Sequence, residues 1–162
     1  MQTILPPPRP PAPTRRHFWT TLTTEATPAQ VWRVWTDLSL WPDFDPEMER
    51  AETPEGDGRF VRLGQSGTGT SGGRELRFEV THFAPGRAYT FTTEMPLGKL
   101  HVHRTLDALP AGGTRLTHEV WFSGASAPVF ALLLGGRFRE ALAGVVPRVA
   151  QLALAQPIVP HE

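Results

Sequence analysis

Three polar side chains, His82, Arg104 and His118, each interrupt a run of alternating apolar residues. Alternation places every second side chain of a strand on one face, so each of the three shares a face with apolar neighbours two positions away. A histidine whose pKa lies near neutrality can move a proton, and an arginine can polarise a carbonyl group. If these side chains face the interior, they can hold a ligand or act on it.

An arginine that faces the interior needs a partner, because burial of an unpaired charge costs a large amount of free energy. The sequence leaves three partners open for Arg104: a protein acceptor, cavity water, or a carboxylate or carbonyl group of a ligand. It also leaves open that Arg104 and His82 lie at strand ends and reach solvent.

The pair His101 and His103 has the spacing of a metal site in a sheet but lacks its surroundings. The two imidazoles lie on the same face of the expected strand, about 7 Å apart. Their apolar neighbours claim the inner face, so we expect both histidines outside. No further ligand follows at a diagnostic spacing, and zinc needs three or four. We therefore predict no metal site.

The segment "GTGTSG" at 67–72 has the glycine spacing of a dinucleotide-binding loop. That loop works by opening a helix whose N-terminus faces the pyrophosphate. Here an alternating strand pattern follows instead, so we predict no cofactor. We interpret the segment as a flexible hairpin loop, and loops of this kind can gate a ligand entrance. Asp43, Asp45 and Glu47 lie in another segment of turn composition and are expected to be solvated.

The elements that would position these side chains follow from hydrophobic periodicity. Thr27 and Gln30 form a capping box, Pro28 suits the first helical position, and Pro42 ends the short helical region. Period-two patterns separated by glycine and proline predict seven strands in an antiparallel arrangement. The expected strands span 17–26, 48–53, 58–64, 74–83, 88–95, 99–109 and 114–123.

The last segment returns to a helical period over residues 126–156 and predicts one long amphipathic helix. Its apolar stripe runs through Phe130, Leu134, Phe138, Ala141, Val145, Val149 and Leu152. Strands followed by this helix indicate an α+β domain.

Two stretches of the chain resemble the START-like SRPBCC superfamily, in particular its polyketide cyclase/dehydrase-like members. The first is "EATPAQVWRVWTDLSLWPDFDP" at 25–46, and the second is "GGTRLTHEVWFSG" at 112–124. The matching positions in the first stretch are Ala26, Pro28, Val31, Trp32, Asp37, Trp41 and Pro42. The resemblance covers about residues 17–156. It implies a helix-grip fold: a seven-stranded curved antiparallel sheet wraps around the C-terminal helix, with one or two short helices after the first strand.

Such a fold encloses an apolar cavity. From the faces on which their side chains are expected to lie, we assign ten residues to ligand binding in this cavity. Trp41 and Phe44 are expected at one mouth of the cavity, and the others on inner faces. The predicted set is Trp41, Phe44, Phe78, His82, Tyr89, Phe91, Arg104, His118, Phe122 and Phe138. The superfamily has no universal catalytic motif, so no catalytic residue follows from the resemblance.

Length and charge limit the remaining possibilities. The chain has 162 residues, enough for one domain. Its 16 basic residues equal its 16 acidic ones, so it lacks the basic excess that is typical of nucleic-acid-binding proteins. Cysteine is absent, the N-terminal segment has no apolar core of a secretion signal, and the longest apolar run, at 128–134, is far too short to span a membrane. A cytoplasmic location fits. We expect a proline-rich flexible tail at 1–15, the START-like domain at 16–156 and a C-terminal tail at 157–162.

Three functions remain open at this point. The first is binding of a small hydrophobic molecule, which could be a lipid, a polyketide-like compound or another aromatic one. The second is a cyclase or dehydratase reaction on such a ligand. The third is a ligand-free interaction module, such as a homodimer. Trp19 and Trp121, which fall on the outward phase, would support the third function if they are exposed, because aromatic side chains are enriched at interfaces.

Overall fold

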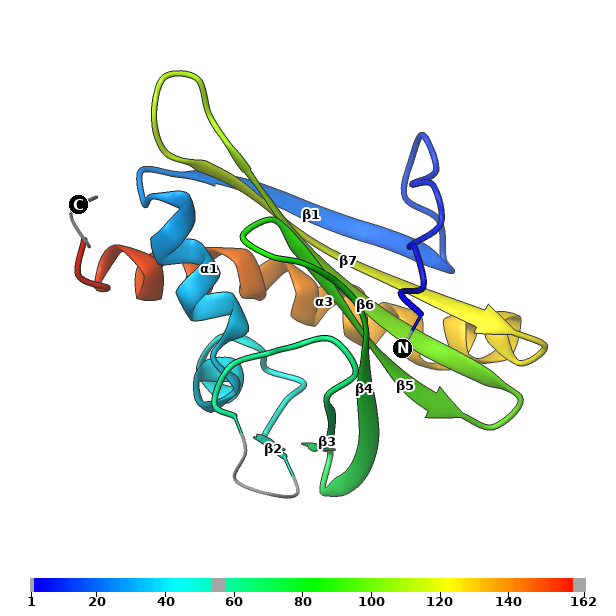
Figure 1. The fold of residues 1–162 in the computed structure, drawn as a ribbon. Coiled ribbons are helices and arrows are strands. Elements are labelled where there is room, and N and C mark those ends of the chain that lie inside the picture. Colours follow the sequence, from blue (N-terminus) through cyan, green and yellow to red (C-terminus); the bar gives the residue numbers. More distant parts are fainter. Residues whose placement is uncertain (1, 54–57, 159–162) are drawn as a thin grey trace.

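In the computed structural model, which describes residues 2–53 and 58–158, an antiparallel sheet curves around one long helix (Figure 1). The sheet has seven strands in the order β1-β7-β6-β5-β4-β3-β2, so the helix-grip α+β fold is confirmed. The strands are β1 (His17–Thr24), β2 (Arg50–Glu52), β3 (Ser66–Ser71), β4 (Arg74–Ala84), β5 (Ala88–Met95), β6 (Gly98–Ala108) and β7 (Thr114–Gly124).

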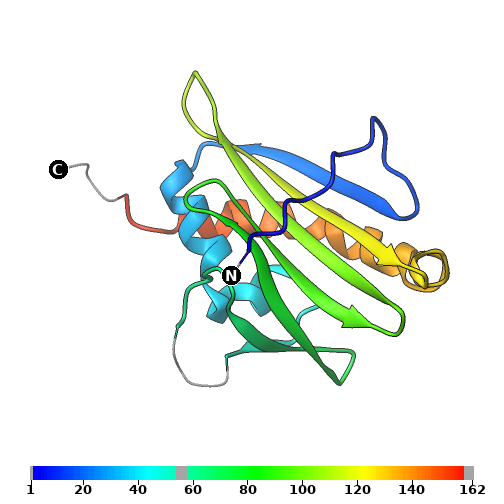
Figure 2. The ribbon, with the colours of Figure 1, turned by 45° about the vertical axis from the view of Figure 1, so that its right-hand side comes forward.

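Helix α3 (Ala127–Leu154) runs along the inner face of the sheet (Figure 2). Its apolar stripe lies against the strands, and Leu142, Val145 and Val149 are all buried there. Burying such side chains contributes about 1.5–3 kcal/mol each, so this stripe is what attaches the helix to the sheet. The predicted helix at 126–156 is therefore confirmed to within two residues.

The short helices after β1 begin with the predicted capping box. In α1 (Pro28–Thr36) the Thr27 hydroxyl accepts from the Gln30 amide at 3.2 Å, and the Gln30 side chain accepts from the Thr27 amide at 2.8 Å. The amide nitrogen of the Gln30 side chain also donates to the carbonyl of Gln156 at 2.8 Å. One residue thus caps α1 and ties it to the end of α3. A short 3-10 helix, η1 (Leu38–Leu40), and helix α2 (Trp41–Phe44) follow.

The strand predicted at 58–64 is wrong. The first part of this segment bonds to the short helices: the Val61 amide donates to the Thr36 carbonyl at 2.8 Å, and the Arg59 carbonyl accepts from the Leu38 amide at 2.8 Å. Its last residue, Gly64, donates to the Val80 carbonyl of β4 at 2.9 Å, but the segment forms no strand. Residues 54–57, between this segment and β2, lie outside the described residues. The third strand of the sheet is instead β3, within the glycine-rich segment that we interpreted as a loop.

Glycine weakens strand propensity, which is why β3 was missed, but here close packing requires it. A Cβ at Gly67 would overlap the ring of Phe78, and a Cβ at Gly69 would lie 2.7 Å from the sulfur of Met48. The backbone of β3 therefore approaches the interior more closely than a larger residue permits.

A bulge in β4 overturns the expected direction of His82. Val80 pairs with Phe91, but the next partners are His82 and Thr90, so Thr81 is the additional residue. One extra residue reverses the phase of all that follow. The prediction that His82 faces the interior is therefore wrong. Its ring lies on the outer face of the sheet, which is the face turned away from α3, with its centroid 5.7 Å from that of His103.

His101 and His103 lie on this outer face, as predicted, on either side of Trp121. Trp121 stacks on His101 at 5.0 Å and meets the edge of His103 at 6.1 Å between ring centroids. The His17 ring lies on the same indole, at 5.3 Å. Trp121 is consequently only 7% exposed, so it does not offer the exposed aromatic surface that would support an interaction module.

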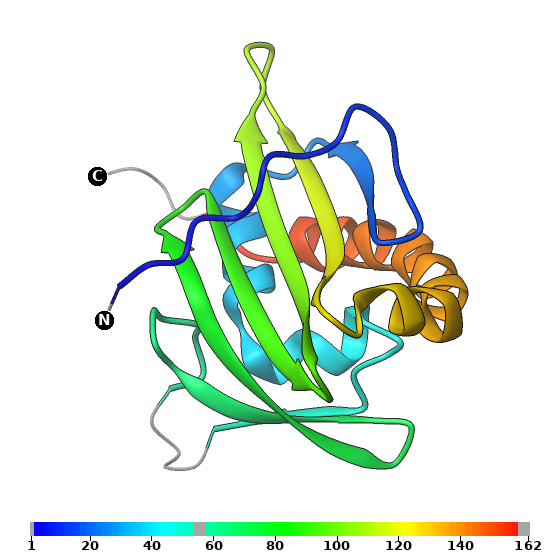
Figure 3. The same cartoon turned by 90° about the vertical axis from the view of Figure 1, so that its right-hand side faces the viewer.

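The proline-rich N-terminal segment lies across this outer face (Figure 3). The Ile4 amide donates to the carbonyl of Thr81 at 2.9 Å, within the bulge. Farther along, the Arg9 guanidinium lies 2.9 Å from the Glu119 carboxylate and 5.2 Å from the centroid of the Trp19 ring. The segment predicted as a tail therefore contacts strands from β4 to β1.

The outer-face histidines predict how stability depends on pH. Burial lowers the pKa of His101 and of His103 to about 4, whereas the unfolded chain binds protons near 6.5. Below pH 6.5 the unfolded state therefore binds more protons, and the free energy of unfolding should fall as the pH drops towards 4. Urea unfolding midpoints at pH 6.5, 5.5 and 4.5 would measure this fall.

The variant His103→Gln, which keeps a polar side chain but cannot titrate, should make this fall shallower. Burial acts to raise the pKa values of the Asp37 and Glu119 carboxylates, but the hydrogen bonds that they accept hold these pKa values below their usual range. Their contribution to stability is lost mainly below about pH 5, so the fall between pH 6.5 and 5.5 reports the histidines. A midpoint that stays constant between pH 6.5 and 4.5 would contradict the assignment.

Candidate functional site

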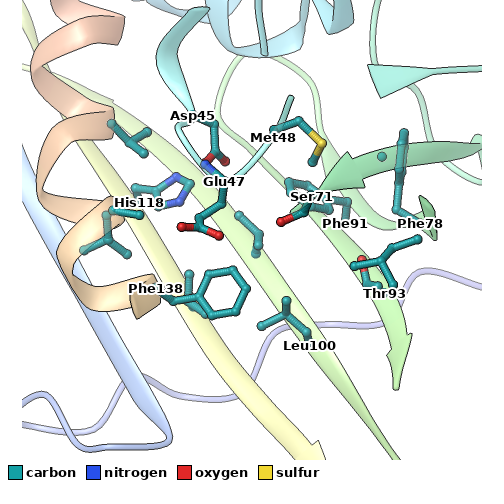
Figure 4. A pocket seen from close by; sticks show the side chains of 17 residues that line it. Asp45, Glu47, Met48, Ser71, Phe78, Phe91, Thr93, Leu100, His118 and Phe138 are labelled. Atoms are coloured by element: carbon teal, nitrogen blue, oxygen red, sulfur yellow. The ribbon is translucent and has the colours of Figure 1, made fainter. Parts of the chain in front are cut away.

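A cavity lies between the inner face of the sheet, helix α3 and the segment that follows α2 (Figure 4). Its empty space amounts to about 620 Å³, which includes space open to solvent at the mouth. Most of the lining is apolar, including Phe78, Phe91, Leu100, Val102, Phe138 and Leu142. The polar side chains in the lining are Asp45, Glu47, Ser71, Thr93 and His118.

The periodicities that form the fold also build this lining. On β6 and β7 the alternate residues Leu100 and Val102, and His118 and Val120, point inward from neighbouring strands. Helix α3 adds Phe138 and the residues one turn farther on. Strand β3 borders the cavity through Gly69 and Ser71, so the segment that we expected to be a flexible loop lines the cavity as a strand.

Arg104 lies at the inner end of this cavity and is fully buried. Its Nη2 atom is 3.1 Å from Oδ2 of Asp45, and Nη1 donates to the Tyr89 hydroxyl at 2.8 Å. Its Nε donates to Nδ1 of His118 at 3.3 Å. The expectation that Arg104 faces inward with a partner is confirmed, and all three partners are protein groups.

Aromatic rings enclose the same guanidinium. Its central carbon lies 4.8 Å from the ring centroid of Trp41, 4.9 Å from that of Phe44 and 5.1 Å from that of Phe91. Such cation–π contacts are strongest when water is excluded. The Trp41 indole and the Tyr89 hydroxyl both donate to one backbone carbonyl, that of Trp35, which joins α1 to the cluster.

Burial perturbs the titratable groups around Arg104. It raises the pKa of Asp45, although the adjacent Arg104 cation opposes this, and it raises the pKa of the Tyr89 hydroxyl. Burial and the Arg104 cation together hold the pKa of His118 well below its usual range. His118 is therefore a neutral imidazole at physiological pH.

The structure separates the ten predicted site residues into groups. Those that line the cavity are Phe78, Phe91, His118 and Phe138. Those that surround the buried guanidinium, behind the lining, are Trp41, Phe44, Tyr89 and Arg104 itself. Phe122 packs against Phe138, with 6.2 Å between ring centroids. His82 lies on the outer face of the sheet, away from the cavity.

Sequence reasoning missed two carboxylates of the site. Asp45 is buried and paired with Arg104, so the expectation that it is a solvated turn residue is wrong. Its other carboxylate oxygen accepts from the Glu47 amide at 3.1 Å. Glu47 in turn binds Arg137 of α3, with oxygen–nitrogen distances of 3.0 and 2.8 Å. The need of Arg104 for an acceptor was the one signal that could have pointed to an acidic partner.

Within residues 2–53 and 58–158, histidine and acidic side chains form no cluster of three or more suited to a metal ion. The described helices include none with the length and apolar character needed to cross a membrane.

The buried ion pair should dominate stability. Replacing Arg104 with methionine removes the cation and leaves Asp45 buried without its partner, which costs about 3–5 kcal/mol of unfolding free energy. Urea unfolding would measure this loss. The double variant Arg104→Met, Asp45→Asn should lose less than the sum of the single changes, because neither charge is then left alone. Arg115→Met, at an exposed position of β7, is the matched control and should change stability by less than about 0.5 kcal/mol.

An Arg104→Met variant as stable as the unmodified chain would show that the pair has no structural role.

Solved structures share this architecture at low sequence identity. Hypothetical protein jhp0584 from Helicobacter pylori aligns with a TM-score of 0.73 and 13% identity, covering 94% of this chain and 99% of that one. For Ara h 8.0201 the TM-score is 0.63 at 17% identity, over 86% and 98% of the two chains. DynU16, from the dynemicin biosynthetic locus, gives 0.64 at 17% identity, over 86% of this chain and 48% of that one.

At these sequence identities, the similarity to solved structures shows a shared fold alone. No curated protein matches the chain by sequence. The model of one family, described as polyketide cyclase / dehydrase and lipid transport, matches residues 15–153. That match spans both short helices, the whole sheet and nearly all of α3, so the chain belongs to this polyketide cyclase / dehydrase and lipid transport family.

Proposed function

We propose that this protein binds a small, mainly apolar molecule in the cavity between the sheet and α3. The observation that carries the proposal is the largely apolar lining of this cavity, whose enclosed part is about 60 Å³, so that a ligand would also occupy the open space toward the mouth. Ligand sites in proteins are commonly concave and apolar, with a few polar groups that orient the ligand. Here Asp45, Glu47 and His118 are the ionisable groups of the lining, and Ser71 and Thr93 add hydroxyl groups.

The elements around the cavity support entry beside α3. Glu47, from the segment after α2, is bound to Arg137 on α3. The turn between β3 and β4 approaches the same arginine, since a Cβ at Gly72 would lie 3.6 Å from its Nη2. The Glu49 amide donates to the Thr70 carbonyl of β3 at 2.7 Å, so the segment after α2 is joined to the sheet by its backbone and to α3 through Arg137. A ligand that enters beside α3 must therefore separate the Glu47–Arg137 pair, in which the arginine side chain is 55% exposed and the glutamate side chain 15%.

Cyclase or dehydratase catalysis is the second candidate, and one observation favours it: the His118 imidazole lines the cavity. Nδ1 of this ring accepts from Arg104, so the ring can only donate a proton from Nε2. It is suited to polarising a carbonyl group and not to removing a proton. Product formation from a diketone substrate, followed by NMR and abolished in His118→Asn, would support this candidate.

Filling the cavity should abolish binding without unfolding the protein. Ala141 lines the cavity, whereas Ala143, on the same helix, is exposed. We expect Ala141→Phe to weaken binding of the neutral aromatic probe 2-acetonaphthone by at least about tenfold, because the new ring occupies the ligand's space. Tryptophan fluorescence titration would measure both affinities.

The matched control Ala143→Phe adds the same ring to solvent and should leave the affinity unchanged. Equal affinities for the two variants would place the bound probe elsewhere and end the proposal.

A further inference from the structure

The charged groups around the cavity leave no cation for a ligand. Among the lining side chains that the structure describes, the ionisable acids are Asp45 and Glu47, and neither arginine nor lysine is present. Arg104 lies behind the lining, is 0% exposed and has each of its three nitrogens bound to a protein acceptor. Arg137, near the mouth, is bound to Glu47 through two of its nitrogens.

This arrangement opposes an anionic ligand. A carboxylate that entered would leave water without gaining a counterion, and an unpaired buried charge is costly. It would also lie near two carboxylates of the protein. A neutral ligand avoids both costs and retains the benefit of the apolar walls.

Besides the hydroxyl groups of Ser71 and Thr93, one nitrogen donor lies next to the ligand space, at the end with the buried ion pair. The Arg104 guanidinium is always protonated and has no acceptor atom, so Nδ1 of His118 must accept from it. The single proton of the neutral imidazole is therefore on Nε2. No described residue accepts from this Nε2, and the ring is among the side chains that line the cavity, at the end where Asp45 lies (Figure 4).

We propose that the cavity selects a neutral apolar molecule with one acceptor oxygen, a carbonyl or hydroxyl group, which receives a hydrogen bond from Nε2 of His118, and that it rejects carboxylates of the same shape. This inference rests on the ligand binding proposed above and adds the chemical class of the ligand. The buried ion pair has a role in this choice, because Asp45 neutralises Arg104 and Arg104 fixes the tautomer of His118.

Three probes with one skeleton test the choice: 2-acetonaphthone, 2-ethylnaphthalene and 2-naphthoate. In titrations of the full chain at pH 7, we expect 2-naphthoate to bind at least about a hundredfold more weakly than the ketone, because it lacks a counterion. A ketone and a carboxylate of equal affinity would overturn the selection while leaving ligand binding intact. If neither the ketone nor the hydrocarbon binds, the proposed function and this inference both fall.

Variants of the inner end separate the hydrogen bond from general packing. His118→Asn keeps an acceptor for Arg104 but no donor at the place of Nε2. It should weaken the ketone about threefold to tenfold, the range of one hydrogen bond, and leave 2-ethylnaphthalene unchanged. His101→Asn makes the same replacement on the outer face of β6 and should change neither affinity. An equal loss for both probes in His118→Asn would reduce His118 to a packing role and overturn the inference.

Two further measurements keep the test valid if His118→Asn unfolds. Nitrogen-15 spectra of the histidine rings in the unmodified chain should show His118 with its proton on Nε2, and this resonance should shift with the ketone but not with the hydrocarbon. A proton on Nδ1 would overturn the proposal.

Asp45→Asn removes the negative partner of Arg104 and should strengthen 2-naphthoate binding relative to the unmodified chain. Unchanged rejection of 2-naphthoate in that variant would contradict the charge argument.

Discussion

The buried Arg104 guanidinium is the constraint on which the rest of this structure depends. A cation without water must be surrounded by acceptors, and no single strand can supply them. Its three partners come from three places: Asp45 after α2, Tyr89 on β5 and His118 on β7. Satisfying one side chain of β6 therefore fixes where the short helices end relative to the sheet.

The same cluster determines the shape of the interior. The rings of Trp41 and Phe44 lie over the cation and occupy the space between the short helices and the sheet. Empty space remains only farther along, where α3 and β3 approach the strands with smaller or apolar side chains. Trp41 and Phe44, which follow α1, thus have a common role: their rings enclose the charge of Arg104. The cavity lies beyond these two rings.

Periodicity was sufficient to predict the fold because the sheet and α3 are regular over most of their length. It also placed Arg104 inside, since Val102 and Leu106 flank it at the strand period. Periodicity failed where a local feature changes which face of the sheet a side chain lies on, or where close packing requires residues of low strand propensity. His82 follows a bulge that no residue type in "EVTHF" announces. Strand β3 consists of residues that usually form turns, and only its close approach to Phe78 explains them.

The site was predicted less completely for a related reason. The alternation along a strand shows which of its side chains face the interior. It does not show which side chain of another element binds to them. Asp45 comes from a segment with turn composition, 59 residues before the arginine that it binds. Such a pairing depends on tertiary geometry alone.

The proline-rich segment along the outer face has one more consequence. Proline cannot donate a backbone hydrogen bond, so a strap of this composition covers a sheet without offering a template for another strand. Through Arg9 it contacts Glu119 and the indole of Trp19, while the hydrogen bonds between the strands of the sheet remain intact. The N-terminal segment therefore covers the outer face of the sheet within the same chain. A chain shortened by about its first dozen residues would expose this face and would associate with other molecules more readily.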